Sequence, residues 1–207
     1  MTKQTEQEII TQVSQLYRRY GIKSVTMDDV SRELGISKKT LYAYFSDKSA
    51  LVSAVVDYLI DTKVSFFEMQ KKGRENAVEE LLFIFRYYLG IVKEFNPSLE
   101  FDLKKYYPQI YSRVKERKRK GIIENTLANL KRGKKEGYFR ADMNENLIAR
   151  LYLLRIESLP ESDLFTQEEI FSQELFEEMF FYHLYGVLSE KGLAYLKNHL
   201  QEIKTLK

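Results

Sequence analysis

The chain has 207 residues, more than one typical domain and fewer than two large ones, so we expect one small and one medium domain. Hydrophobic residues make up 44% of it, enough for a core, and the formal net charge of +3 is too small to indicate a nucleic-acid-binding protein by itself. Cysteine is absent, which excludes disulfides, thiolate zinc sites and cysteine nucleophiles. No apolar signal segment opens the chain and no long uncharged apolar run follows, so we expect a cytoplasmic protein that does not enter a membrane.

The apolar residues recur at the period of an α-helix almost everywhere, and the chain contains only nine glycines and three prolines. We therefore predict an all-α fold of about nine to ten helices, with a small N-terminal domain at 1–48 and a helical bundle at 49–207. The predicted helices are 9–20, 26–34, 37–45, 47–60, 76–95, 99–106, 111–135, 144–158, 166–188 and 192–203. Asn96-Pro97 is expected to end one of them, and an interruption of 111–135 near Gly121 is an alternative.

The pattern of residues 26–48 predicts a helix-turn-helix, in which two short helices meet across a tight turn. Gly35 lies in that turn and can take a positive φ without steric cost. The residues expected to pack inward are apolar: Val30, Leu34, Ile36, Leu41 and Phe45. The outward residues of the second helix can enter a major groove and donate hydrogen bonds: Ser37, Lys38, Lys39, Thr40, Tyr42 and Tyr44. Thr26 and Lys48 stand at helix starts, where each can contact a phosphate.

Each of these features has a plainer interpretation. Tyr42 and Tyr44 could be packing residues, although two positions apart on a helix at least one should be exposed. Lys38 and Lys39 could form a solvated face. Residues 1–48 hold eight Lys/Arg against six Asp/Glu, and the acidic pair at 28–29 could repel DNA. The prediction of DNA binding therefore depends on geometry more than on charge.

The same segment resembles the DNA-binding domain of the TetR family of bacterial repressors. The residues that carry the resemblance stand at the family's spacing: Tyr20-Gly21, Thr26, Asp29-Val30-Ser31, Leu34-Gly35-Ile36-Ser37, Thr40-Leu41-Tyr42, Tyr44-Phe45, Lys48 and Leu51. The resemblance implies phosphate contacts by Thr26, Tyr42, Tyr44 and Lys48, and base reading by residues 37–40. Met27 is included in the DNA-binding set. A second, weaker similarity is the turn Gly137-Tyr138-Phe139-Arg140-x-Asp142, common in the family's C-terminal domain.

The family resemblance also implies partners. It predicts a homodimer that binds a palindromic double-stranded DNA operator and is released from it by a small-molecule effector. Residues 1–48 would be the DNA-binding domain, and residues 49–207 would bind the effector and form the dimer. The family places its pocket where the helices 57–70, 76–95 and 111–135 converge.

The candidate pocket residues are mainly aromatic, which suggests an apolar or aromatic effector: Phe67, Phe85, Tyr88, Tyr107 and Tyr111. Arg86 stands on an otherwise apolar helix, where an unpaired charge is costly to bury. It could anchor an acidic effector. Alternatively, it pairs with a carboxylate such as Asp102 or Glu157, or reaches solvent.

The C-terminal part contains two segments of opposite charge and two apolar stripes. Residues 104–135 carry twelve Lys/Arg against two Glu, and residues 141–178 carry two Arg against ten Asp/Glu. The basic stretch could be a second nucleic-acid patch, or a solvated face partly neutralised by the acidic one. Two apolar stripes fit a dimer seam or an internal core: Leu147/Leu151/Leu154 and Phe176/Phe180/Leu184/Val187.

The sequence contains no motif that indicates a catalytic site. His183 and His199, the only histidines, have no metal-spaced partners, and neither a phosphate-binding loop nor a nucleophile elbow is present. We therefore expect neither an enzyme nor a cofactor or metal. The alternatives to a ligand-responsive repressor are an effector-independent regulator on the same fold and an all-helical adaptor protein.

Overall fold

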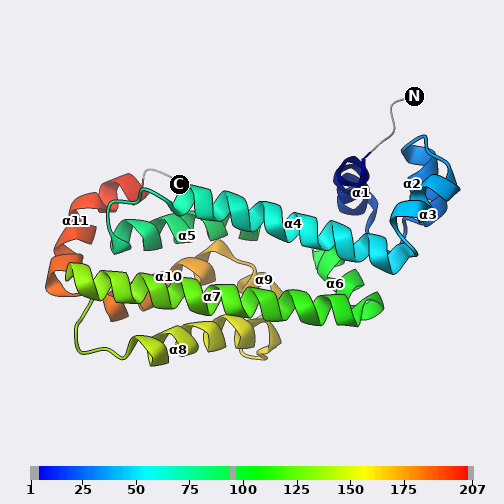
Figure 1. Ribbon diagram of the computed structural model, residues 1–207. Helices are drawn as coiled ribbons and strands as arrows, with labels where there is room; N and C mark the ends of the chain where they lie inside the picture. Colours follow the sequence, from blue (N-terminus) through cyan, green and yellow to red (C-terminus); the bar gives the residue numbers. More distant parts are fainter. Residues whose placement is uncertain (1–4, 94–96, 205–207) are drawn as a thin grey trace. The chain divides into compact units, whose positions relative to one another are not determined.

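A computed structural model describes residues 5–93 and 97–204 of the chain (Figure 1). In these ranges it forms eleven α-helices, one 3-10 helix and no strand, so the all-α prediction is confirmed. The helices are α1 (Glu6–Tyr20), α2 (Met27–Glu33), α3 (Lys38–Tyr44), α4 (Lys48–Lys71), α5 (Ala77–Lys93), α6 (Pro97–Tyr106), α7 (Pro108–Glu136), α8 (Glu145–Ser158), η1 (Leu159–Glu161), α9 (Gln167–Ile170), α10 (Gln173–Val187) and α11 (Glu190–Lys204). None of the described helices has the length and apolar character that spanning a bilayer requires.

The helix boundaries differ from the prediction at several places. The segment 166–188 is two helices, because the extended backbone of Ser172 breaks it and the Ser172 side chain caps α10. Helix α7 begins at Pro108, since proline is tolerated in the first turn, and it runs through Gly121 without interruption. The predicted break at Asn96 lies outside the described residues.

The chain divides into two compact units. Unit 1 comprises residues 1–69 and 96–116, and unit 2 comprises residues 70–95 and 117–207. The functional boundary predicted at residue 48 stays a prediction, because compactness does not test which residues bind DNA.

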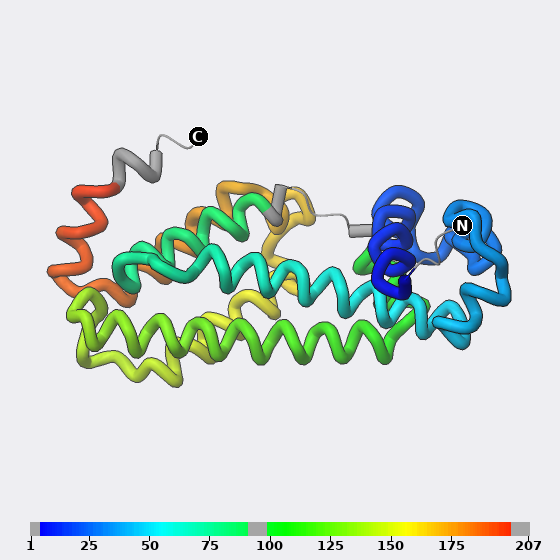
Figure 2. Tube along the Cα trace, turned by 45° about the horizontal axis from the view of Figure 1, so that its top comes forward, coloured from blue at the N-terminus to red at the C-terminus, as the bar shows by residue number. Residues whose placement is uncertain are grey.

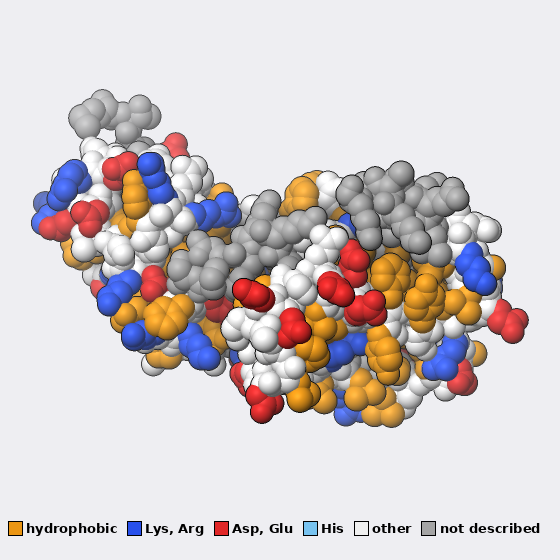
Figure 3. Space-filling model, turned by 180° about the vertical axis from the view of Figure 1, so that it is seen from behind, with side chains coloured by type: hydrophobic (Ala, Val, Ile, Leu, Met, Phe, Trp, Pro, Cys, Tyr) orange, Lys and Arg blue, Asp and Glu red, His pale blue; other side chains and the backbone are white. Residues whose placement is uncertain are grey.

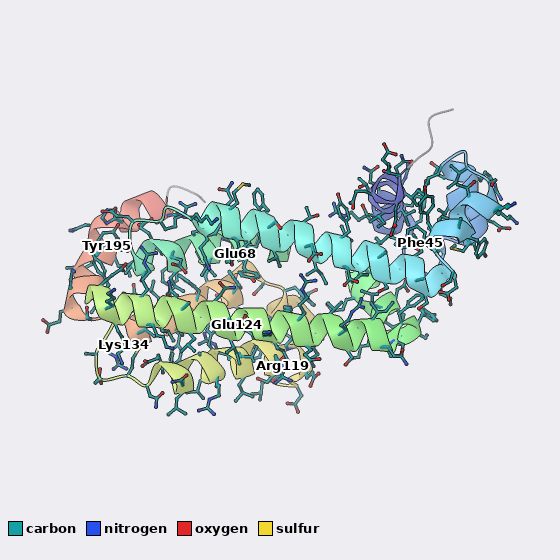
Figure 4. The ribbon with its side chains drawn as sticks, viewed as in Figure 1. Phe45, Glu68, Arg119, Glu124, Lys134 and Tyr195 are labelled. Atoms are coloured by element: carbon teal, nitrogen blue, oxygen red, sulfur yellow. The ribbon has the colours of Figure 1, made fainter. Side chains whose placement is uncertain are left out.

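The core of unit 1 is built from the apolar stripes of α1 to α4. Ile9 and Val13 of α1, Leu41 of α3 and Leu51 of α4 are fully buried in it. Phe45, at the end of α3, lies between α3 and α1 (Figure 4). Burying an aliphatic or aromatic side chain stabilises a fold by about 1.5–3 kcal/mol, so these contacts determine how α1, α3 and α4 pack.

The core of unit 2 includes stacked aromatic rings where α5 meets α10. The ring of Phe85 lies 4.3 Å from that of Phe180 and 5.5 Å from that of Phe176. A partly buried ion-pair network joins α5 to α7 in this unit: Arg132 of α7 binds the buried Glu80 of α5 at 3.0 Å. Because the remaining donors of Arg132 also find acceptors, this charge is compensated.

Helix α8 lies alongside the C-terminal part of α7 (Figures 1 and 2). Arg119 points from α7 toward α8 and binds Glu157 at 3.1 Å (Figure 4). The turn between α7 and α8 buries Phe139, whose backbone N–H donates to Gly133 at 3.0 Å. This ring packs directly on the α7 backbone, where Gly133 has no side chain to obstruct it.

Gly133→Ala should lower the free energy of unfolding by roughly 1–3 kcal/mol, because the new methyl group would overlap the Phe139 ring. Gly121→Ala on the same helix is the matched control: its added Cβ meets nothing within 4 Å, and alanine favours the helix by up to about 1 kcal/mol. Urea unfolding followed by circular dichroism compares the two variants. Equal midpoints would contradict this packing.

Candidate functional site

Two short helices, α2 and α3, form the candidate DNA-binding site, and local sequence fixes the ends of both. Thr26 and Asp29 make a reciprocal capping box at the start of α2. Ser37 caps α3 by accepting from the Thr40 N–H at 3.0 Å. Between the helices Gly35 has a φ of +65°, as predicted, a conformation that side-chain-bearing residues rarely adopt. The helix-turn-helix geometry is therefore encoded locally.

Core packing decides which face of α3 is outward. Leu41 and Phe45 are buried, together with the predicted Val30 of α2 and Leu34 directly after it, and Ile36 packs against them. On the opposite side Ser37, Lys38, Lys39 and Tyr42 are exposed, Tyr42 by 47%. Thr40 is half-buried, and Tyr44 is half-buried against the core of unit 1. The outward face consequently carries hydroxyls, two ammonium groups and one phenol.

Two residues at the start of α2, Met27 and Thr26, have their side chains engaged within unit 1. The side chain of Met27 is only 7% exposed and packs in the core of unit 1, which leaves the backbone of Met27 for the DNA contact that stays a prediction. The hydroxyl of Thr26 donates to the Asp29 carboxylate at 2.6 Å and accepts from the Asp29 N–H at 3.1 Å. A phosphate contact by this hydroxyl would have to compete with the capping box.

The acidic pair of α2 is already partnered. Asp28 binds the Lys38 ammonium at 2.6 Å, and hydrogen bonds from Thr26 lower the pKa of Asp29. An exposed ion pair is worth about 0–1 kcal/mol, so Lys38 can leave Asp28 for another acceptor at little cost. These contacts reduce the repulsion of DNA that the sequence suggested.

Lys48, at the start of α4, is held by the loop between α1 and α2. Its ammonium donates to the backbone carbonyl of Lys23 at 3.0 Å, and burial lowers its pKa. The N–H of Lys23 in turn donates to Asp102 of α6 at 2.9 Å. Seventy-nine residues separate Lys23 from Asp102, so no local sequence signal could have revealed this connection.

The six predicted effector residues fall in both units. Phe67 of α4 is buried in unit 1, where Tyr107 and Tyr111 are half-buried. Tyr111 donates to Glu100 at 3.2 Å. In unit 2, Phe85 is a core residue, and burial raises the pKa of Tyr88 to about 12. Three of the six residues thus belong to unit 1 and three to unit 2, and their role in effector binding stays a prediction.

Neither carboxylate suggested for Arg86 is its partner. Asp102 accepts from Lys23, and Glu157 binds Arg119. The Nε of Arg86 is buried and has no acceptor among the residues that the structure describes. A second arginine of unit 2, Arg155 of α8, is in the same state, and sequence reasoning had assigned it no role.

The basic stretch of α7 is partly neutralised. Arg113 binds Asp57 at 2.9 Å, and Lys134 binds Glu145, a residue of the acidic segment, at 3.0 Å. These pairs agree better with a neutralised helix face than with a second nucleic-acid patch. Within the described ranges, no cluster of His, Cys, Asp or Glu could hold a metal ion.

Comparison with known proteins agrees with this geometry. Residues 9–55 match the family model described as "Bacterial regulatory proteins, tetR family". An uncharacterized HTH-type transcriptional regulator of Bacillus subtilis is 31% identical over 106 residues, 49% of this chain and 54% of the relative. The chain thus spans about half the length of this curated relative.

Solved structures of transcriptional regulators share the fold. One from Cytophaga hutchinsonii superposes with a TM-score of 0.74 at 15% identity, covering 88% of this chain and 98% of that one. A putative regulator from Saccharomonospora viridis, solved in complex with choline, gives a TM-score of 0.59 at 17% identity, covering 88% of this chain and 96% of that one. These proteins are described as transcriptional regulators, not as enzymes.

Proposed function

We propose that this chain is a repressor of the TetR family of bacterial transcriptional regulators, whose family model matches its residues 9–55. As a homodimer it binds a near-palindromic operator, with α3 of each subunit in a major groove. A small apolar or aromatic molecule bound by the C-terminal part releases it. The effector must bind the DNA-competent and DNA-incompetent states with different affinities, and such coupling is typically ~1–3 kcal/mol.

One observation carries the DNA-binding part of the proposal: α3 is buried on one side only. Leu41 anchors the helix in the core, while Ser37, Lys39 and Tyr42 face outward with groups that bond to bases and phosphates. A two-fold dimer would place two such helices about one helical turn of DNA apart, ~34–36 Å. The net charge contributes little, because residues 1–48 hold eight Lys/Arg against six Asp/Glu.

The exposed apolar face of α8 and α10 supports dimerisation. Unit 2 shows hydrophobic side chains gathered on its surface (Figure 3). Leu151 and Leu154 of α8 are 59% and 60% exposed, and Tyr182 of α10 is 79% exposed. The other predicted stripe, which includes Phe180 and Leu184, is buried in the core of unit 2. The seam we propose therefore uses the tyrosine face of α10 with the leucine face of α8.

The direct test of function is selection of genomic DNA fragments by the purified protein at low salt. Retention of a near-palindromic site supports the repressor mechanism. Failure to retain any fragment would favour the alternative of an adaptor protein on this fold.

On a selected fragment, Lys48→Ala should weaken binding to all sequences and reduce the slope of log K against log salt by about one per lost phosphate contact. Lys39→Ala should instead change the sequence preference, because Lys39 lies on the outward face of α3. Lys197→Ala, an exposed lysine of α11, is the control and should change neither. An unchanged salt slope for Lys48→Ala would remove Lys48 from the phosphate contacts.

Leu151→Glu should dissociate the homodimer at micromolar concentration, because two carboxylates would enter an apolar seam. Sedimentation velocity measures the change. Leu164→Glu is the matched control: Leu164 is 82% exposed but lies between η1 and α9, outside the seam. A dimer that survives Leu151→Glu would place the interface elsewhere.

A further inference from the structure

Three helices of unit 2 bring polar aromatic residues to one arginine. Tyr152 and Arg155 stand on α8, His183 on α10 and Tyr88 on α5. The guanidinium carbon of Arg155 lies 5.5 Å from the centroid of the Tyr152 ring, and the ring of His183 lies 4.6 Å from the same ring. Tyr88 is close enough to Tyr152 for the Tyr152 phenol to contribute to the raised pKa of Tyr88.

This arginine is a half-buried cation without an anion. Its Nε is buried and unpaired, and in the described parts of the chain no carboxylate binds the guanidinium. The neighbours of its guanidinium are the uncharged rings of Tyr152 and Tyr182, and burial lowers its pKa. Desolvated charges in proteins are normally paired, because an unpaired one is expensive. An unsatisfied group of this kind in a folded protein calls for an explanation.

The neighbours of Arg155 carry no negative charge at neutral pH. Burial and the nearby arginine lower the pKa of His183 to about 4, so its imidazole is neutral and can still donate one N–H. Burial raises the pKa of Tyr152 and that of Tyr88, so both phenols keep their protons. The cluster therefore offers a cation whose buried Nε has no acceptor among the described residues, beside a phenol and an imidazole that can each donate a hydrogen bond.

We propose that Arg155, with Tyr152 and His183 beside it, forms an anion subsite that binds the carboxylate of an acidic effector whose aromatic or apolar body lies against the neighbouring rings. A planar guanidinium matches a carboxylate through two parallel hydrogen bonds. This proposal rests on the proposed function and changes the effector class from merely apolar to acidic. Arg86 is not part of it, because a helix turns 100° per residue and Arg86 stands about 200° around α5 from Tyr88.

A small ligand fits this subsite better than a side chain of a second subunit. Any acceptor for the Arg155 Nε must come within about 3 Å of an atom that solvent does not reach. His183, which adjoins the Tyr152 ring, is also buried. The proposal therefore places the acceptor of the Arg155 Nε within unit 2, beneath the α8–α10 surface that the dimer would cover.

The experiment compares acids with their uncharged amides on the full-length protein. Benzoate is compared with benzamide, 2-naphthoate with 2-naphthamide, and decanoate with decanamide. Binding is measured by thermal shift and calorimetry. We expect at least one acid to bind at least about tenfold more tightly than its amide, the size of a charged hydrogen bond. Arg155→Gln should abolish that preference and leave amide binding within about twofold.

Arg150→Gln is the matched control, because Arg150 is an exposed arginine on the same helix whose Nε donates to the Asn146 carbonyl. It should keep the acid preference. Circular dichroism checks that both variants are folded, and should Arg155→Gln fail to fold, His183→Phe serves as the second variant, with a weakened preference expected.

No acid preferred over its amide, or a preference that survives Arg155→Gln, would overturn the proposal. So would dissociation of the dimer by Arg155→Gln with acid binding unchanged, since Arg155 would then serve the subunit interface. Selection of genomic DNA without ligand tests the repressor mechanism separately. A protein that retains operator DNA but prefers no acid contradicts only the anion subsite.

Discussion

The burial of Leu41 and Phe45 in the core of unit 1 is the constraint on which the candidate DNA-binding surface depends. Helix α3 has seven residues, too few to be stable without tertiary contacts. Its packing against α1, α2 and α4 therefore both forms the helix and fixes its rotation. Once that rotation is set, Ser37, Lys39 and Tyr42 face outward.

The parts of this surface that sequence could predict are those encoded by near neighbours. The caps of α2 and α3, the positive φ of Gly35 and the inward apolar residues follow from residues within about one helical turn of each other. Such signals also locate most helix ends. They could not separate α9 from α10, because a single capping serine at position 172 inside an apolar pattern gives a weak signal.

Long-range polar partners were beyond prediction for a physical reason. From sequence alone, many carboxylates or carbonyls are equally suitable partners for a given lysine or arginine. Only the packed fold determines which of them lies within hydrogen-bonding distance. Lys48 binds the carbonyl of Lys23, and Arg119 rather than Arg86 binds Glu157. The burial of the Met27 side chain likewise depends on how α2 packs in the core of unit 1. That the buried Nε of Arg155 has no acceptor among the described residues can be seen only when such pairings in unit 2 are known.

The central claim is that the outward face of α3 contacts DNA, and photo-crosslinking tests it most directly. The protein carries p-benzoylphenylalanine in place of Tyr42, and in a second variant in place of Leu164, which is more exposed but lies between η1 and α9, outside the proposed seam. After irradiation with the DNA fragments that the protein retains, we predict a covalent adduct from position 42 and none from position 164. An adduct from position 164, or none from position 42 in a variant that still retains DNA, would contradict the claim.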